Sequence, residues 1–401
     1  MSDTPDPRRS ENRTPSVRPP GRRGIPTWFR GALAALALYA FIASVSMIGA
    51  GLKTVAKDPH GAEVLNGLFA QISDPITGLF IGLLVTSLVQ SSSFTTSMTV
   101  GLVATGELSL PHAIPIIMGA NVGTSVTNTL VCMGSIRRTR EFRRSLSSAV
   151  VHDYFNVLSI LVLLPLEMGF GVISRLTLLI SEALSRTSLF GSADVGNVGS
   201  LKHFFAYPAD AVKFLLLDAA GARDILGGAI MAALALALLF TALWLLVKCL
   251  RGLMLRRLSG VFSKTVFRNP PTAFLAGLIA TVSVQSSSVT TSLVVPLVGA
   301  GLLRLKQIYP YILGANIGTT VTAMLAALGT GSAPALACAF GHLLFNLFGT
   351  AIFWPLRFIP LSLAKGFAKV ATRRRYLAVG ALLGLFFLLP LLVIGLRQLF
   401  T

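Results

Sequence analysis

The sequence predicts an all-α polytopic membrane protein built from two inverted-topology repeats. Apolar residues make up 53% of the 401-residue chain and charged residues only 12%, whereas soluble domains are about 25% charged. Long segments contain no Asp, Glu, Lys or Arg, and two polar motifs recur at one fixed spacing. These features exclude an ordinary soluble enzyme, a disordered chain and a nucleic-acid-binding domain.

Several charge-free segments are long enough to cross a bilayer, which takes about 20 helical residues. They cover residues 75–106, 108–136, 229–247, 269–303, 307–356 and 376–396. An earlier apolar stretch, roughly 28–52, predicts the first spanning helix, because it is too long for a signal-peptide core and has no cleavage site. Residues 1–27 are rich in Pro, Arg and Ser and predict a disordered cytoplasmic tail. We therefore expect one transmembrane transport domain over residues 28–401.

The net charge of +19 would suggest a nucleic-acid partner in a soluble protein, but here the basic residues gather between apolar spans. They concentrate in residues 8–30, 137–144, 248–268 and 365–375. Such a bias is typical of cytoplasmic loops, so the N-terminus is expected in the cytoplasm. The weakly charged connections at 52–74, 175–225 and 329–333 are then expected outside.

Some residues at the ends of spans are expected to have ordinary structural roles. Cys132, Cys249 and Cys338 follow no motif spacing, which predicts packing and neither a disulfide nor a metal site. Glu107 and Glu167 are expected in solvated connections.

Two motifs recur with the same offset along the chain. The segments Gln90–Ser97 (QSSSFTTS) and Gly119–Thr127 recur as Gln285–Ser292 (QSSSVTTS) and Gly314–Thr322, each displaced by 195 residues. A shared offset predicts an internal duplication, with repeat one at about 75–175 and repeat two at about 269–360. A weaker echo matches His152 and Asn156 to His342 and Asn346, with an offset of 190.

The charge pattern gives the two copies opposite orientations. Repeat one follows an outside loop and precedes the basic segment 137–144, whereas repeat two follows the basic segment 248–268 and precedes the neutral turn at 329–333. Inverted repeats are typical of secondary transporters, which bind substrate near the bilayer midplane at the repeat interface. The sequence therefore favours transport.

Each motif places a run of hydroxyl groups and one Gln in the middle of a charge-free stretch. An isolated Ser or Thr in a spanning helix usually bonds to its own backbone. A cluster of five or more, present twice, favours a binding site, because unpaired polar groups in lipid cost several kcal/mol each. The surrounding windows of 32 and 35 residues are long for one helix and suit a re-entrant hairpin or a broken helix.

A broken helix also predicts the class of ligand. Its exposed N–H groups and positive dipole end bind anions, while hydroxyl and carbonyl oxygens suit Na⁺. Neither motif contains Arg or Lys, so co-bound cations would have to balance the charge of an anion. The sequence thus predicts a small oxyanion bound together with alkali cations, as in coupled symport.

One carboxylate lies within a spanning helix expected over roughly 145–174. A charged side chain in the bilayer costs about 2.5–3.5 kcal/mol by insertion scales, which makes Asp153 a candidate functional residue. The alternative for Asp153 is a helix-start residue at the membrane interface. Its neighbour His152 is more often structural.

These residues closely resemble the type II sodium–phosphate cotransporter family. The matching segments are Gln90–Ser93, Ile114–Asn121, Gly123–Ser125, Glu141–Arg144, Val151–Asp153, Phe155–Asn156, Leu161–Glu167, Gln285–Ser288 and Gly314–Thr320. The resemblance covers about 75–175 and 269–350. It implies inward symport of inorganic phosphate driven by Na⁺ through alternating access. The expected partners are phosphate, Na⁺ as the coupling ion and only metal, and the bilayer, without a further cofactor.

The resemblance also implies site residues. Phosphate is expected at Gln90, Ser91, Ser92, Ser93, Gln285, Ser286, Ser287 and Ser288. A family sodium site matches Asn156, Ala315, Thr319 and Thr322, with Ala315 acting through its backbone, and we expect Asp153, Asn121, Thr124 and Asn316 to complete the sodium sites. Electrogenic members carry Asp at the position of Asp153 and electroneutral ones carry Gly, so the resemblance implies electrogenic uptake.

The chain departs from the family pattern in two places. Counted back without gaps, Ser135 and Arg138 occupy positions where the family has Gln and Asp, which should weaken or relocate that sodium site. A shorter, cysteine-free segment replaces the family's large extracellular loop. This indicates a bacterial-type member in the inner (plasma) membrane.

Other functions remain open at this point. Hydroxyl groups do not name an oxyanion, so a sodium-coupled symporter of sulfate or a dicarboxylate is the runner-up. An intramembrane hydrolase with a Ser and His152 or His342 is disfavoured, because duplicating the whole motif has no catalytic use. A channel would not need inverted copies of the motifs. We therefore expect a transporter and not an enzyme.

Overall fold

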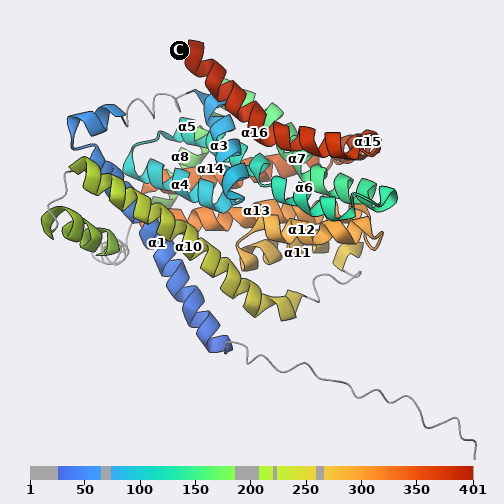
Figure 1. Ribbon diagram of the computed structural model, residues 1–401, viewed down its shortest axis with the longest axis horizontal. Coiled ribbons are helices and arrows are strands. Elements are labelled where there is room, and N and C mark those ends of the chain that lie inside the picture. The colour runs from blue at the N-terminus through green and yellow to red at the C-terminus, as the bar shows by residue number, and fades with distance from the viewer. Residues whose placement is uncertain (1–25, 65–73, 186–206, 220–223, 259–265, 401) are drawn as a thin grey trace, which may run out of the picture.

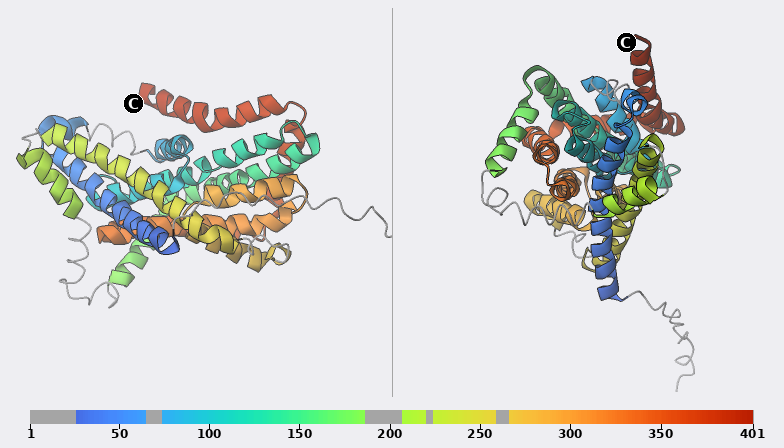
Figure 2. Two further views of the ribbon diagram at one scale, coloured as in Figure 1. Left: turned by 60° about the horizontal axis from the view of Figure 1, so that its bottom comes forward. Right: turned by 90° about the vertical axis from the view of Figure 1, so that its left-hand side faces the viewer.

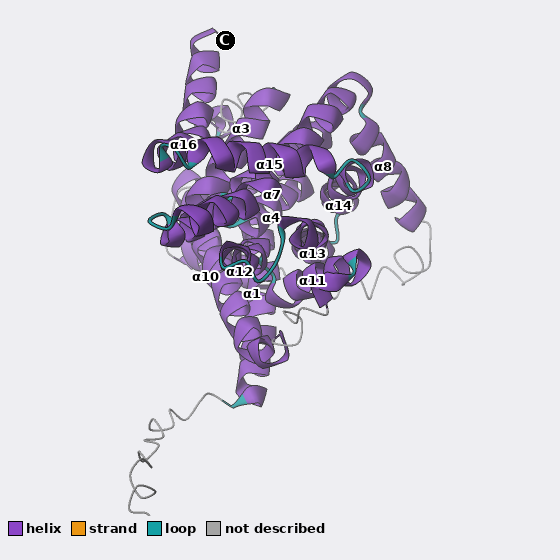
Figure 3. Cartoon of the chain, turned by 90° about the vertical axis from the view of Figure 1, so that its right-hand side faces the viewer, coloured by secondary structure: helices purple, strands orange, loops and turns teal. Residues whose placement is uncertain are grey.

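The computed structural model describes residues 26–64, 74–185, 207–219, 224–258 and 266–400, and these residues are helical apart from short connections (Figure 3). Six helical segments in this part of the chain are long and apolar enough to cross a membrane. They are Leu110–Ser135, Thr139–Phe170, Asp224–Ala242, Leu305–Thr330, Ala333–Phe353 and Arg375–Arg397. The all-helical polytopic prediction is confirmed. The prediction for residues 1–27 falls almost wholly outside the described residues.

The first half of the chain contains long and short helices. They are α1 (Thr27–Val55), α3 (Pro75–Val89), α4 (Ser92–Thr105), α5 (Leu110–Gly123), α6 (Val126–Cys132), a 3-10 turn (Met133–Ser135), α7 (Thr139–Phe170) and α8 (Val172–Ser185). A π-helical turn, Phe214–Ala219, follows. Figure 1 shows α3, α4 and α5 close together, with the long helix α7 beside α6.

The second half repeats this order of helices. It contains α10 (Asp224–Leu258), a 3-10 turn (Val266–Arg268), α11 (Pro270–Val284), α12 (Ser287–Gly299), α13 (Leu305–Thr330), α14 (Ala333–Phe353), α15 (Phe358–Ala371) and α16 (Arg375–Phe400). The single helix α13 corresponds to the pair α5 and α6. The neutral connection expected at 329–333 is a two-residue turn between α13 and α14.

Glycines let equivalent helices touch in the two halves. A Cβ at Gly119 of α5 would overlap the carbonyl oxygen of Leu79 in α3, and a Cβ at Gly314 of α13 would overlap that of Phe274 in α11. Both members of the second pair lie 195 residues after those of the first. Small residues are what permit such backbone contact in membranes. The duplication is therefore visible in helix packing as well as in sequence.

Helices α1 and α10, which precede the two repeated units, run side by side in two views (Figures 1 and 2). Their contact also depends on glycine, since a Cβ at Gly51 would lie 2.9 Å from the carbonyl oxygen of Gly228. The pair joins the halves along one side of the bundle.

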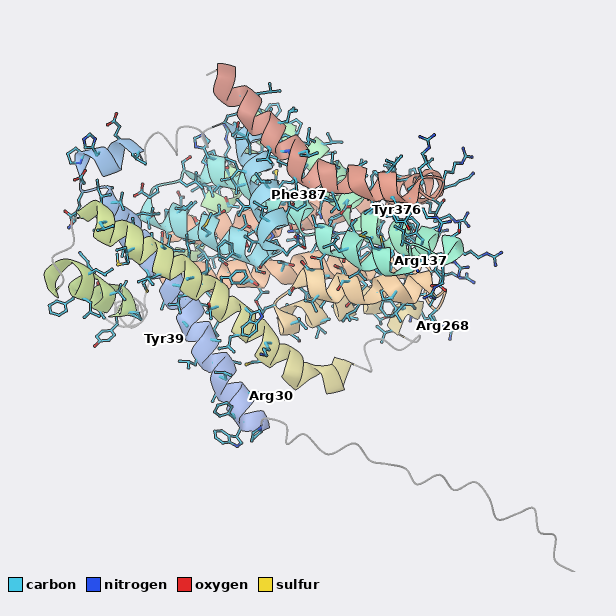
Figure 4. All side chains as sticks on the ribbon, in the orientation of Figure 1. Arg30, Tyr39, Arg137, Arg268, Tyr376 and Phe387 are labelled. Carbon is cyan, nitrogen blue, oxygen red and sulfur yellow. The ribbon has the colours of Figure 1, made fainter. Side chains whose placement is uncertain are left out.

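Basic segments that are distant in sequence meet at one end of the molecule. The Arg375 guanidinium donates to the carbonyl oxygen of Ile136 at 2.7 Å, which joins segments 365–375 and 137–144. Arg137 and Arg268 lie at this same end (Figure 4). An ion pair of 2.5 Å between Arg397 and Asp74 ties the last helix to the start of α3. The grouping of basic segments agrees with the charge pattern of the sequence.

Two expectations for the first half are wrong. Helix α7 begins at Thr139, before the expected residue 145, so Asp153 lies well inside the helix and not at its start. Glu167 is buried instead of solvated. The reason is a reversal at Gly171, which has a φ of 59° and folds the next helix back. Glu167 then accepts the backbone N–H of Ile173 at 2.7 Å and caps α8, which occupies the start of the expected 175–225 connection.

Candidate functional site

Both glutamine–serine motifs interrupt a helix in the same way. Gln90 ends α3 with a φ of 58° and Gln285 ends α11 with a φ of 56°. They are the non-glycine residues with positive φ in the described part of the chain, a strained conformation that marks functional sites. The next serine is extended, and its hydroxyl accepts an N–H from three residues ahead, Phe94 in α4 and Val289 in α12. Each motif thus ends one helix and caps the next.

Hydrogen bonds hold the two breaks in matching geometry. Thr127 donates to Gln90 Oε1 at 2.8 Å, and Thr322 donates to Gln285 Oε1 at 2.6 Å. Each glutamine amide nitrogen donates to a backbone carbonyl three residues earlier. Each glutamine side chain therefore links its helix break to the second repeated motif of the same half, Gly119–Thr127 or Gly314–Thr322. Thr127 was not among the expected site residues, although its 195-residue offset from Thr322 could have indicated it.

Threonine pairs bridge each break from helix to helix. The hydroxyls of Thr86 and Thr95 lie 2.8 Å apart, and those of Thr281 and Thr290 lie 2.7 Å apart. All four side chains are buried. A buried hydroxyl pair satisfies polar groups that would otherwise be costly, so these hydroxyls stabilise the breaks rather than remaining available to a ligand.

The two breaks line one small cavity of about 180 Å³. Its polar lining comes from Gln90 and Ser91 of the first motif and Gln285 and Ser286 of the second. The remaining wall includes Phe240 and Trp244 of α10, which the sequence did not indicate because α10 carries no polar motif. No cationic side chain of a described residue lines this cavity. The motifs expected to share a ligand are therefore brought together.

The following serines lie in the first turns of α4 and α12. Ser92, Ser93, Ser287 and Ser288 are all buried. Ser93 contacts Thr322 at 3.4 Å, a contact between the two halves. The first N–H groups of a helix have no partner within the helix, so both helix N-termini direct donors and positive dipole ends toward the region of the breaks.

A buried network of histidines and asparagines joins the halves reciprocally. His152 Nε2 lies 2.6 Å from Asn316 Oδ1, and His342 Nε2 lies 3.3 Å from Asn121 Oδ1. Each histidine thus bonds the asparagine of the other half. Asn316 also donates to Asn156 at 3.1 Å. These contacts bring together three of the residues expected at sodium sites, and they indicate that the 190-residue echo reflects structural equivalence.

Asp153 follows His152 on α7 and shares the Ser125 hydroxyl with it as a neighbour. Both carboxylate oxygens are buried and form no hydrogen bond of standard geometry with a described residue. The Ser125 hydroxyl is engaged 2.8 Å from His152 Nδ1. A buried carboxylate without a partner is strongly unfavourable, so it is a natural ligand for a cation.

The other expected sodium residues bond within their own helices. Thr124 donates to the Ala120 carbonyl at 3.1 Å, and Thr319 donates to the Ala315 carbonyl at 3.1 Å. Thr322 instead joins the second glutamine break. The expected set is therefore divided between the asparagine network and the breaks.

The two departures from the family pattern lie away from this network. Ser135 is in the turn after α6, and Arg138 precedes α7 and forms an exposed ion pair of 2.8 Å with Glu141. Neither side chain hydrogen-bonds a described residue of the asparagine network.

The comparisons with known proteins agree with this geometry. The family model for the Na⁺/Pi-cotransporter matches residues 40–193 and 238–399. The chain is 35% identical to the sodium-dependent phosphate transport protein 2A of Ovis aries over 90% of this chain and 66% of the relative. It is 32% identical to the human sodium-dependent phosphate transport protein 2B over 90% of this chain and 64% of the relative.

The chain thus spans about two thirds of the length of these relatives. No solved structure matches it. The matched family is one of transporters and not of enzymes. Since its model covers most of the sequence in two segments, the chain belongs to the Na⁺/Pi-cotransporter family.

Proposed function

We propose that this protein imports inorganic phosphate coupled to Na⁺ by alternating access, with net charge moved in each cycle. The observation that carries the proposal is the single cavity shared by Gln90, Ser91, Gln285 and Ser286. Two helix N-termini point donors toward it, and its described lining includes no cationic side chain. An anion there would depend on co-bound cations for charge balance, which is the requirement for coupling.

For phosphate, the available donors are the N–H groups at the starts of α4 and α12 and the hydroxyls of Ser92, Ser287 and Ser288. Gln90 and Gln285 position these donors by holding the breaks, and each retains one amide N–H for the substrate. Ser91 and Ser286 act as helix caps that also border the cavity.

For sodium, we assign Asp153 as the charged ligand. Its unpartnered oxygens lie beside a network whose amide and carbonyl oxygens, including those of Asn121, Asn156 and Asn316, suit an alkali cation. Thr124, Ala315, Thr319 and Thr322 supply further oxygens on α5 and α13. Because the carboxylate would neutralise one Na⁺, the remaining bound charge would determine the voltage dependence.

We further propose that α3 with α4 and α11 with α12 form re-entrant hairpins that enter the membrane from opposite faces. The equal breaks and the paired glycine contacts support two repeats, and the charge pattern of the flanking segments supports their inversion. The meeting of the basic segments 137–144 and 365–375 at one end supports a cytoplasmic placement of that end, and the basic residues within 8–30 support a cytoplasmic N-terminus. The short connection after repeat one, without cysteines, supports a bacterial-type protein in the inner membrane.

Radiolabelled phosphate uptake into proteoliposomes tests this function. Uptake should require outside Na⁺, fail with K⁺ in its place, and increase when the interior is made negative. Sodium-dependent uptake that ignores voltage would remove the electrogenic assignment alone. Sulfate or dicarboxylate uptake without phosphate uptake would replace the substrate, and sodium-independent phosphate flux would overturn the coupling.

A further inference from the structure

A second, larger cavity lies at the basic end of the molecule. It has a volume of about 790 Å³ and is bounded by α7, the turn between α12 and α13, and α15. These helices surround the end face seen in Figure 3. Six cationic residues line it: Arg143, Arg144, Arg304, Lys306, Lys365 and Lys369. Its described lining contains no Asp or Glu.

The cationic side chains that line this cavity have no anionic partner in the described part of the chain, whereas neighbouring arginines are bonded. Arg138, close by in sequence, is paired with Glu141 at 2.8 Å, and Arg375 donates to a backbone carbonyl. None of the six lining cations forms an ion pair with a described carboxylate. Cations from three separate elements converge on one concavity, an arrangement that raises the local concentration of anions.

The backbone holds two of these elements in close contact. A Cβ at Gly301, in the turn after α12, would meet the guanidinium of Arg144. A Cβ at Gly299 would overlap the hydroxyl of Ser145 on α7. The concavity is therefore a feature of helix packing and not of side-chain rotation alone.

We propose that this cavity binds an anion that carries several clustered phosphate groups. One phosphate group bears about −1.5 to −2 charges at neutral pH, so about three are needed to balance six cations. The volume falls within the range of about 300–1,000 Å³ that is typical of small-molecule sites. Arg and Lys are the side chains that bind phosphate oxygens best. The bound anion would connect α7 of the first half to the α12–α13 turn and α15 of the second.

Clustered phosphates can come from a soluble oligophosphate or from the headgroups of anionic lipids. The test for the first source is calorimetric titration of the full-length protein in neutral detergent with inorganic triphosphate, at physiological salt. Triphosphate should bind, and inorganic phosphate should not match its affinity at this cavity. The test for the second source is native mass spectrometry after reconstitution in phosphatidylcholine with and without cardiolipin.

Two variants of equal charge separate this cavity from general electrostatics. The variant Arg144→Gln/Arg304→Gln/Lys365→Gln should weaken binding at least about tenfold, since each substitution removes a charge-assisted contact. The control Lys53→Gln/Lys57→Gln/Arg175→Gln removes the same charge from exposed positions elsewhere and should bind like the wild type. The single variant Lys365→Gln, on an exposed face of α15, gives a smaller loss if the triple variant does not fold.

Each result decides the proposal. Triphosphate binding that is lost in the cavity variant supports a soluble source. Cardiolipin retention that is lost in the same variant, without triphosphate binding, supports headgroups. Equal losses in both charge variants, or no binding of either probe, would overturn the site. Because binding is read without transport, these outcomes are independent of phosphate uptake.

Discussion

Replacement of Asp153 by Asn gives the sharpest test of the proposed sodium site. The carboxylate is buried with no hydrogen-bond partner of standard geometry among the described residues, which would penalise a sodium-free folded state by several kcal/mol if the carboxylate stays charged. The amide that replaces the carboxylate would carry no charge. Asp153→Asn should therefore stabilise the sodium-free protein by about 1–3 kcal/mol.

Sodium should stabilise the wild type much more than it stabilises Asp153→Asn. A ligand present at about 100 times its dissociation constant stabilises the folded state by about 2.7 kcal/mol. The wild type should therefore gain about that amount when choline chloride is exchanged for NaCl at constant ionic strength, and Asp153→Asn should gain much less. Thermal unfolding in detergent measures both changes.

Asp74→Asn is the control for this experiment, because it removes a carboxylate at the start of α3 that is already paired with Arg397. Its sodium response should equal that of the wild type. The reasoning fails if Asp153→Asn retains the full sodium shift, or if it strongly destabilises the sodium-free protein.

Three further predictions concern the scaffold. Gly314→Ala should destabilise the protein by more than about 3 kcal/mol or abolish expression, because the added Cβ would overlap the facing backbone. A lower melting temperature would show this loss. Gln285→Ala and Thr322→Val should each slow phosphate uptake, and a double-mutant cycle should give a coupling of about 1 kcal/mol for their 2.6 Å bond. Burial alone would raise the pKa of Asp74, but hydrogen bonds and the Arg397 charge hold that pKa below its usual range. The stabilisation that Asp74 contributes should therefore be present above the unfolded pKa of about 3.9 and be lost as pH falls through the lower folded pKa. Acid unfolding curves of Asp74→Asn should lack this loss.

Matched controls separate these effects from general instability. Gly366→Ala adds the same methyl group where nothing lies within 4 Å and should not lower the melting temperature, since Ala favours the helix over Gly by up to about 1 kcal/mol. Additive uptake losses for Gln285→Ala and Thr322→Val would count against a hydrogen bond between these two side chains that stabilises the helix break. Unchanged acid unfolding in the Asp74 variant would count against its ion pair.

Much of the architecture follows from the fixed offset of the two motifs. The spacing between Gln90 and Gln285 identified equivalent positions, and the structure gives those positions the same left-handed conformation. The same offset relates the glycines of α5 and α13. Period and offset are local properties of sequence, so they can be found without tertiary information.

Contacts between the halves could not be predicted in this way. The sequence placed Asn316 in one motif and His152 in a separate, weaker echo, and nothing in their spacing shows that one bonds the other. Trp244 lines the small cavity only because α10 packs beside the two helix breaks. Glu167 was expected in solvent because the chain reversal at Gly171, which buries it, has no signal beyond a glycine.

The histidine–asparagine segments of the two halves differ in their charge. Repeat two carries Leu343 where repeat one carries Asp153, although the flanking His and Asn are present in both. If the halves exchange conformations during a cycle, the polar network returns to an equivalent state while the carboxylate does not. If Asp153 holds Na⁺ as proposed, an electric field across the membrane would act unequally on the two halves. A scaffold with near-twofold symmetry would then respond to the sign of the membrane potential through a single acidic residue.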